Sequence, residues 1–147
     1  MKEKTTKIGW KIMRRSKRLG HLRTLYRGLH GSRELEVDAW YTAERKWATE
    51  GGRRFYWSGF HVLENLADMG GYLTRFSKLA DVQVVPCLFA GGNPKPTNMR
   101  VRLARHVRLL HPSGIRAERV LQLHYKGGAR LEIVDADWRA RLVLSQW

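Results

Sequence analysis

The sequence predicts an α+β fold, in which a twisted, largely antiparallel sheet carries one main helix, about residues 65–76, packed on a face. Three observations support this prediction. Segments with strand character outnumber helical ones, and most of them follow one another along the chain. Only residues 65–76 combine a helix cap with a long apolar face. The 147 residues contain no internal repeat and no long linker, so we expect a single domain, 1–147.

The N-terminal part is expected to begin with a flexible basic tail, residues 1–6, followed by a strand over residues 7–15. The apolar residues of that strand alternate onto one face: Ile8, Trp10 and Ile12. A basic connection then leads to residues 21–28, which we expect to pair back as a second strand. This hairpin would present a basic ribbon. Residues 34–37 are expected to form a short extended piece.

The middle of the chain is expected to hold a short helix, a strand and the main helix. Helical spacing between residues 38 and 49 is shown by Trp40, Ala43 and Trp47. Residues 55–63 are aromatic and β-branched, which favours a strand, and Gly59 within them indicates a bulge or a close backbone approach. In the main helix, Gly70 and Gly71 cost about 2 kcal/mol relative to two alanines. We therefore expect tertiary contacts to support that helix.

The C-terminal part is predicted to be mostly β. Residues 82–89 are an apolar strand, in which Pro86 indicates an edge or a bulge. Residues 91–98 are rich in Gly, Pro and Asn and predict a loop. Lys126–Gly128 has the composition of a hairpin turn. Strands are expected on both sides of this turn and at the C-terminus, over 120–125, 130–134 and 138–147.

Residues 99–110 alternate in the manner of a strand with one apolar and one basic face. The apolar face is predicted to hold Val101, Leu103, Val107 and Leu109. The basic face is predicted to hold Arg100, Arg102, His106 and Arg108. Arg105 falls on the apolar side, so it is expected either to turn outward at a bulge, or to pair with an acid at 132, 135 or 137, or to line a pocket.

Positive charge is concentrated in two runs. The chain has 28 Lys and Arg against 13 Asp and Glu, a net charge of +15. Residues 1–27 hold ten bases and one acid, and residues 95–119 hold seven bases and one acid. Such patches attract phosphates and acidic surfaces, so the expected partner is nucleic acid, or an acidic or nucleoprotein surface. The candidate contact residues are Lys11, Arg14, Arg15, Lys17, Arg18, Arg100, Arg102 and Arg108.

Residue types that would indicate catalysis or a cofactor do not fall into recognised patterns. The six histidines and Cys87 show no metal-ligand spacing, so we expect neither a metal nor another cofactor. Ser58 and His61 would point to opposite faces of a strand and could not act as a nucleophile–base pair without a bend at Gly59. A single cysteine suits a reducing cytoplasm, and no apolar run has the length of a membrane span. We therefore expect a non-catalytic cytoplasmic protein.

Parts of the chain between residues 24 and 109 resemble small uncharacterised proteins of phages and mobile elements. The resemblance is carried by Leu25-Tyr26, Leu35 to Trp40, Ala43-Glu44, Ser58-Gly59-Phe60-His61-Val62, Tyr72-Leu73, Val84-Val85 and Val101 to Ala104. It implies a phage-type origin and an intracellular setting in the host. Small proteins of this kind often act against host systems, including nucleic-acid-guided defences. An alternative function is therefore a protein–protein inhibitor of such a defence complex, similar to an anti-CRISPR protein.

A second, partial resemblance is to ADP-ribosyltransferases. Tyr26-Arg27-Gly28 is similar to their strand that carries an arginine for a nicotinamide dinucleotide, and Gly59 to Val62 followed by a helix is similar to their strand–helix segment. The resemblance implies a late catalytic glutamate, for which Glu132 is the candidate. It gives a third expectation, an enzyme that transfers ADP-ribose.

Overall fold

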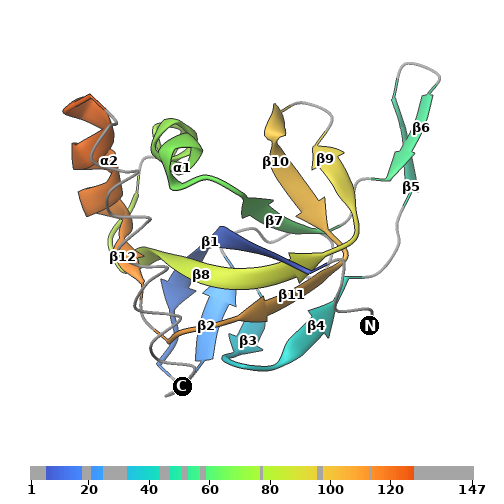
Figure 1. Ribbon diagram of the computed structural model, residues 1–147, viewed down its shortest axis with the longest axis horizontal. Coiled ribbons are helices and arrows are strands. Elements are labelled where there is room, and N and C mark those ends of the chain that lie inside the picture. The colour runs from blue at the N-terminus through green and yellow to red at the C-terminus, as the bar shows by residue number, and fades with distance from the viewer. Residues whose placement is uncertain are drawn as a thin grey trace.

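The computed structural model describes residues 6–17, 21–24, 33–43, 47–50, 53–56, 59–76, 78–95, 98–112 and 114–127. Their fold is a mostly antiparallel β-sheet curled into a nearly closed barrel, with two short helices beside one another on one side (Figure 1). The expected α+β class with a twisted antiparallel sheet is therefore confirmed. Within the described residues, no helix is long and apolar enough to cross a membrane.

Ten of the described strands form one sheet. Its main path runs in the order β4 (Trp40–Thr42), β11 (His106–Leu109), β8 (Val82–Ala90), β1 (Lys7–Arg15), β7 (Phe60–Leu63), β10 (Asn98–Ala104) and β9 (Asn93–Lys95). Three strands lie off this path: β2 (His21–Thr24) pairs with β1, β3 (Glu34–Glu36) pairs with β2, and β12 (Ile115–Arg116) pairs with β8. The strands β5 (Trp47–Glu50) and β6 (Arg53–Tyr56) form a separate hairpin that extends away from the barrel (Figure 1).

The long pair β1–β8 forms the centre of the sheet. Its register runs from Lys7 opposite Phe89 to Arg14 opposite Val82. Pro86 lies inside β8, where its carbonyl accepts a hydrogen bond from Leu110 N at 3.0 Å. In an antiparallel strand, the N and O atoms of one residue point toward the same neighbouring strand. The nitrogen of Pro86, which has no hydrogen to donate, therefore points toward the chain between β11 and β12. This local interruption explains how a central strand accepts a proline.

Side chains from the two faces of the central strands enter two separate clusters. One lies between the sheet and the helices and includes Trp10, Ile12, Val82, Val84 and Val101. The other fills the barrel interior and includes Met13, Val62, Val85, Phe89 and Val107. The sequence of β8 is almost continuously apolar because both of its faces are covered.

The helices α1 (Leu66–Leu73) and α2 (Ala117–Tyr125) pack against each other over the first cluster. The predicted main helix is thus present, with Asn65 at its N-cap position but with no side-chain cap hydrogen bond. A Cβ atom placed on Gly70 would lie 2.7 Å from the Cβ of His124. The support expected for the glycine pair therefore comes from α2.

Three predicted elements are wrong. The described residues of the segment 38–49 are not helical, because residues 40–42 form β4, residues 47–49 belong to β5, and Asp38 sits in a turn with φ 64°. Residues 120–125 belong to helix α2, whose buried residues Ala117, Val120 and Leu123 recur every third position. Residues 93–95 of the predicted loop form β9, paired with β10.

Two predicted strands each divide into two. Residues 55–63 divide around Gly59, where an added Cβ would lie 2.9 Å from the backbone of Leu103, so the expected close approach is confirmed. Residues 99–110 divide at Arg105 into β10 and β11. The predicted strands over 7–15, 34–37 and 82–89 are confirmed over most of their lengths. The strand predicted over 21–28 is confirmed for residues 21–24, and its residues 25–28 lie outside the described residues. The strands expected at 130–134 and 138–147 lie outside the described residues, as do residues 1–5 of the expected tail.

Candidate nucleic-acid interface

The first basic run places exposed cations at the end of β1. Arg14 and Arg15 are the last two residues of the strand and both are exposed, as is Lys17 just after it. Successive strand residues point to opposite faces, so Arg14 and Arg15 project on the two sides of the sheet edge. Arg18 lies outside the described residues.

Arg14 stands directly opposite Arg23 of β2, and Arg23 stands opposite Glu34 of β3. Side chains paired in this way are about 5 Å apart at their Cβ atoms, so two guanidinium groups repel each other here. Glu34 offsets one of the two charges and also accepts a hydrogen bond from Ser16. Arg14, Arg23 and Glu34 together therefore carry a net charge of one positive unit at the surface.

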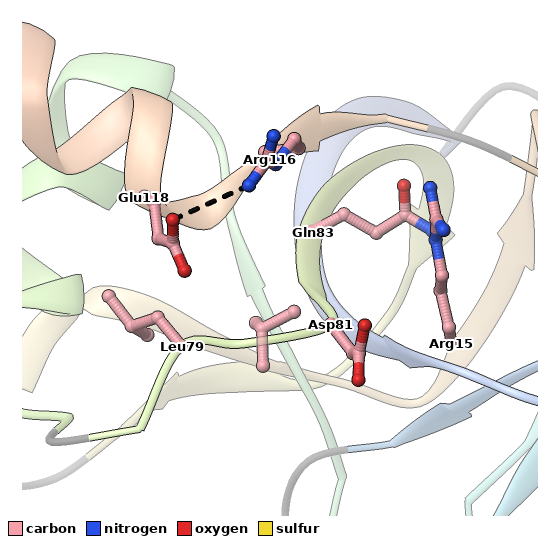
Figure 2. Close-up of a pocket in the computed structure, with 7 residues that line it drawn as sticks. Arg15, Leu79, Asp81, Gln83, Arg116 and Glu118 are labelled. Carbon is pink, nitrogen blue, oxygen red and sulfur yellow. Dashed lines mark hydrogen bonds and ion pairs between the residues drawn. The ribbon is translucent and has the colours of Figure 1, made fainter.

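A pocket of about 210 Å³ lies next to this end of β1. Arg15 and Arg116 line it, together with Gln83 of β8 and Asp81, the residue before β8 (Figure 2). Their positions follow from strand pairing, because Arg15 N donates to Asp81 O at 3.0 Å and Arg116 stands opposite Gln83. Arg116 belongs to the second basic run, so the two runs meet at this pocket.

The polar groups of the pocket differ in their freedom to move. Gln83 is only 5% exposed, and its Oε1 accepts a hydrogen bond from Gly114 N at 2.9 Å, which fixes the carboxamide. Arg116 contacts Glu118 at 3.5 Å, but these side chains are 77% and 50% exposed. A pair so exposed contributes at most about 1 kcal/mol, so Arg116 can exchange Glu118 for another anion.

We define the basic end by the exposed cations that gather near the last residues of β1, the first residues of β8 and the first turn of α2. They are Arg14, Arg15, Lys17, Arg23, Arg116 and Arg119. The carboxylates that stand opposite these cations or line the pocket with them are Glu34, Asp81 and Glu118. Cations exceed carboxylates two to one here, which makes the basic end attractive to anionic partners.

The second predicted basic face does not exist as one face. Arg102 pairs with Val62, whose side chain enters the barrel interior, whereas Arg108 pairs with Leu88, which faces the opposite way toward Ile8. The strand division at Arg105 reverses which residues point outward. The expectation that Arg100, Arg102 and Arg108 point together is therefore wrong, although all four predicted apolar partners are buried.

Two of these arginines already contact carboxylates. Arg100 Nη1 lies 2.9 Å from Asp68 of α1, and Arg108 Nη2 lies 3.7 Å from Asp38. Arg105 donates a hydrogen bond from its guanidinium to the carbonyl of Ala43, and its own carbonyl accepts from Ala43 N at 2.8 Å. Arg105 thus turns away from the apolar face at the strand division, as one of its predicted alternatives required.

Lys11 does not belong to the accessible surface. Its side chain is 3% exposed, its Nζ donates to the carbonyl of His61 at 3.2 Å, and it lies over the ring of Phe60. Burial lowers the pKa of Lys11 to about 8, an effect that nearby Cys87 opposes. Burial likewise raises the pKa of Cys87 to about 12. The prediction that Lys11 contacts a nucleic acid is contradicted, because no phosphate can reach a buried amine.

No described group of His, Cys, Asp and Glu side chains is arranged to hold a metal ion. The strand–helix order implied by the resemblance to ADP-ribosyltransferases is present as β7 followed by α1. Arg27 and Glu132, the residues to which that resemblance assigns dinucleotide binding and catalysis, lie outside the described residues.

Sequence reasoning did not identify Asp81, Gln83 or Arg116 as site residues. One available signal was Gln83, because it is the only polar residue of the apolar segment VQVVPCLF. A buried side-chain amide in such a strand needs a hydrogen-bonding partner, so Gln83 indicates a polar contact at a defined place in the fold. Arg116 carried no local signal, because its proximity to Arg15 depends on the pairing of β8 with both β1 and β12.

Comparisons with known proteins found no family model, no curated protein and no solved structure that matches this chain.

Proposed function

We propose that this chain binds nucleic acid, or a nucleoprotein complex, through the basic end and without catalysis. The observation that carries the proposal is the pocket at which Arg15 of the first basic run meets Arg116 of the second. Both side chains come from ordered strands and both are exposed. Guanidinium groups held in this way can form paired hydrogen bonds with phosphate oxygens.

Charge repulsion at the basic end gives a bound anion a further role. Arg14 and Arg23 face each other across β1 and β2, and Glu34 offsets only one of them. A phosphate placed over this pair would reduce the repulsion while it releases counterions from the nucleic acid. Binding should therefore weaken steeply as salt increases.

The test is fluorescence anisotropy of labelled single- and double-stranded oligonucleotides over a series of salt concentrations. Replacing both pocket arginines, Arg15→Gln with Arg116→Gln, should lower affinity roughly 10-fold near 0.1 M salt. The slope of log affinity against log salt should fall by about 1.5, since two phosphate contacts are lost. The matched control is Lys7→Gln, which removes one charge from the opposite end of β1, roughly 26 Å away, and should change affinity less than about 2-fold.

Negligible affinity of the unaltered protein for both kinds of nucleic acid at low salt would overturn the proposal. So would a loss of log affinity in the Lys7→Gln control that is half or more of the loss in the pocket double variant, because one charge removed against two would then account for the effect whatever its position.

A second candidate function is inhibition of a host nucleic-acid-guided defence complex by protein–protein contact, as the resemblance to small phage proteins implies. It is supported by a row of paired residues across four strands, Ile8, Leu88, Arg108 and Trp40, of which the two end residues are exposed and the two middle ones are half-buried. Ile8 and Trp40 are 41% and 39% exposed, unusually high values for large apolar side chains. An exposed aromatic beside an arginine is typical of protein contact surfaces.

The two candidates separate in a pull-down from host lysate that is repeated after nuclease treatment. A complex that survives nuclease and is lost with Trp40→Ala supports the protein–protein function. A complex that is lost with nuclease and with Arg15→Gln supports nucleic-acid binding.

A further inference from the structure

The pocket at the basic end has the chemistry of a site for a base rather than for a phosphate alone. Its lining combines donors, Arg15 and Arg116, with acceptors, Asp81 and Glu118. A phosphate offers only acceptors and would meet two carboxylates at close range. A nucleobase offers donors and acceptors on one edge, and it carries no charge.

The size and the apolar part of the pocket agree with this chemistry. Its volume of about 210 Å³ would hold roughly seven waters, less than the pockets that bind drug-sized molecules. Leu79 and Val82 contribute apolar surface to the lining. A planar ring needs such a surface for its face and polar groups for its edge.

Gln83 supplies the most ordered polar group of the pocket. It lies between Arg116 and Arg15 (Figure 2), and its Oε1 is held by Gly114 N. That bond leaves the amide nitrogen of Gln83 as its donor toward a ligand. Asp81, a turn residue with φ 62°, also lines the pocket and brings a carboxylate to it.

We propose that this pocket takes one unpaired nucleobase, with Gln83 and Asp81 at its edge and with Arg15 and Arg116 reaching the flanking phosphates. The inference rests on the proposed function and narrows its ligand to single-stranded or locally unpaired nucleic acid. A base inside a duplex cannot enter the pocket without leaving its stack.

The experiment compares two oligonucleotides of roughly ten nucleotides, one of thymidines and one with abasic residues throughout, which have the same number of phosphates. The unaltered protein should bind the base-containing strand at least about 5-fold more tightly, the lower end of what one hydrogen-bonded base contributes. Gln83→Glu keeps the acceptor for Gly114 N but removes the donor. It should abolish most of the ratio between the affinities for the base-containing and the abasic strand. Circular dichroism checks that the variant folds.

Asp81→Asn is the second variant, because this side chain is exposed and asparagine tolerates a positive φ. For a base pocket it should reduce the ratio between the two strands. For a phosphate site it would instead raise affinity for both strands equally, since a repelling charge is removed.

Equal affinity for the two strands in the unaltered protein would overturn the base pocket and leave the basic end as a phosphate-binding surface. A ratio that persists in both variants would also overturn it, because the base would then be recognised elsewhere. Failure of both strands to bind would overturn the base pocket together with the proposed function.

Discussion

Lys11 shows how a single residue can differ from its neighbours in an alternating basic strand. The sequence places it among cations at the surface, but the second face of β1 is covered by the barrel interior. The ammonium group therefore loses its contact with water. Among the described residues, its contacts are the carbonyl of His61 and the ring of Phe60. Its lowered pKa, about 8, follows from this loss of water.

Replacing Lys11 by an uncharged side chain of similar length should stabilise the protein near neutral pH. Below about pH 8 the amine is charged in both states, and only the folded state bears the full cost of its burial. We expect Lys11→Met to raise the free energy of unfolding by about 1–3 kcal/mol at about pH 7. Urea unfolding measures this difference, and the nucleic-acid affinity of the variant should be unchanged.

The difference in unfolding free energy between Lys11→Met and the unaltered protein should shrink as pH rises from about 8 toward 10.5. In this range the folded protein loses the Lys11 proton before the unfolded chain does. In the unaltered protein, stability should rise from about pH 8 to 9 and then level off. Above pH 9 the unfolded chain loses the Cys87 proton first, because the folded pKa is raised from 9.0 to about 12. A Lys11→Met variant that is less stable by more than about 1 kcal/mol at neutral pH would contradict this account.

At the scale of elements, the sequence predicts those strands whose pattern is decided locally. The pairing of β1 with β2 and the extent of β8 follow from alternation and from apolar runs. The segment 38–49 and helix α2 were assigned wrongly, because pairing with β11 selects an extended Trp40–Thr42 and packing on α1 favours a helix over 117–125. Both β11 and α1 lie far along the chain from the segments whose conformation they determine.

The contact between α1 and α2 predicts opposite effects for two neighbouring glycines. Gly70→Ala should destabilise the protein by about 1–3 kcal/mol, because the new Cβ would lie 2.7 Å from the Cβ of His124. Gly71→Ala should stabilise it by about 0.5–1 kcal/mol, since its Cβ would be 3.9 Å from the nearest atom and alanine favours helices. Thermal unfolding of the two variants measures the contrast. Equal effects of the same sign would indicate that the helices do not pack as described.

At the scale of the whole molecule, the barrel sorts the two basic runs into different places. Arg15 and Arg116 are brought together, whereas Arg100 is held by Asp68 of α1 and Arg108 by Asp38. The charge runs could be counted from the sequence, and three of the candidate contact residues, Arg14, Arg15 and Lys17, are exposed. The strand division at Arg105 and the position of β12 determine which cations share a surface. Neither feature can be recognised in the local sequence pattern.

This arrangement predicts unequal contributions to nucleic-acid binding from arginines that look alike in the sequence. Arg15→Gln should reduce the salt slope by about 1, the value of one phosphate contact. Arg100→Gln should leave the slope unchanged and alter affinity less than about 2-fold, because Arg100 lies on β10 beside Asp68 of α1 and is not part of the basic end. Titrations at a series of salt concentrations measure both slopes. A larger effect from Arg100 would place the binding surface on β10 instead.

The pairing of β1 with β8 has a consequence for synthesis of the chain on the ribosome. Residues 7–14 of β1 pair with residues of β8 that lie 68–82 positions later, so this strand leaves the ribosome long before β8 can cover it. At typical elongation rates this delay is about 3–16 s. During that time the apolar residues of both β1 faces are exposed in the nascent chain, and we expect chaperones that bind apolar segments to recognise it there.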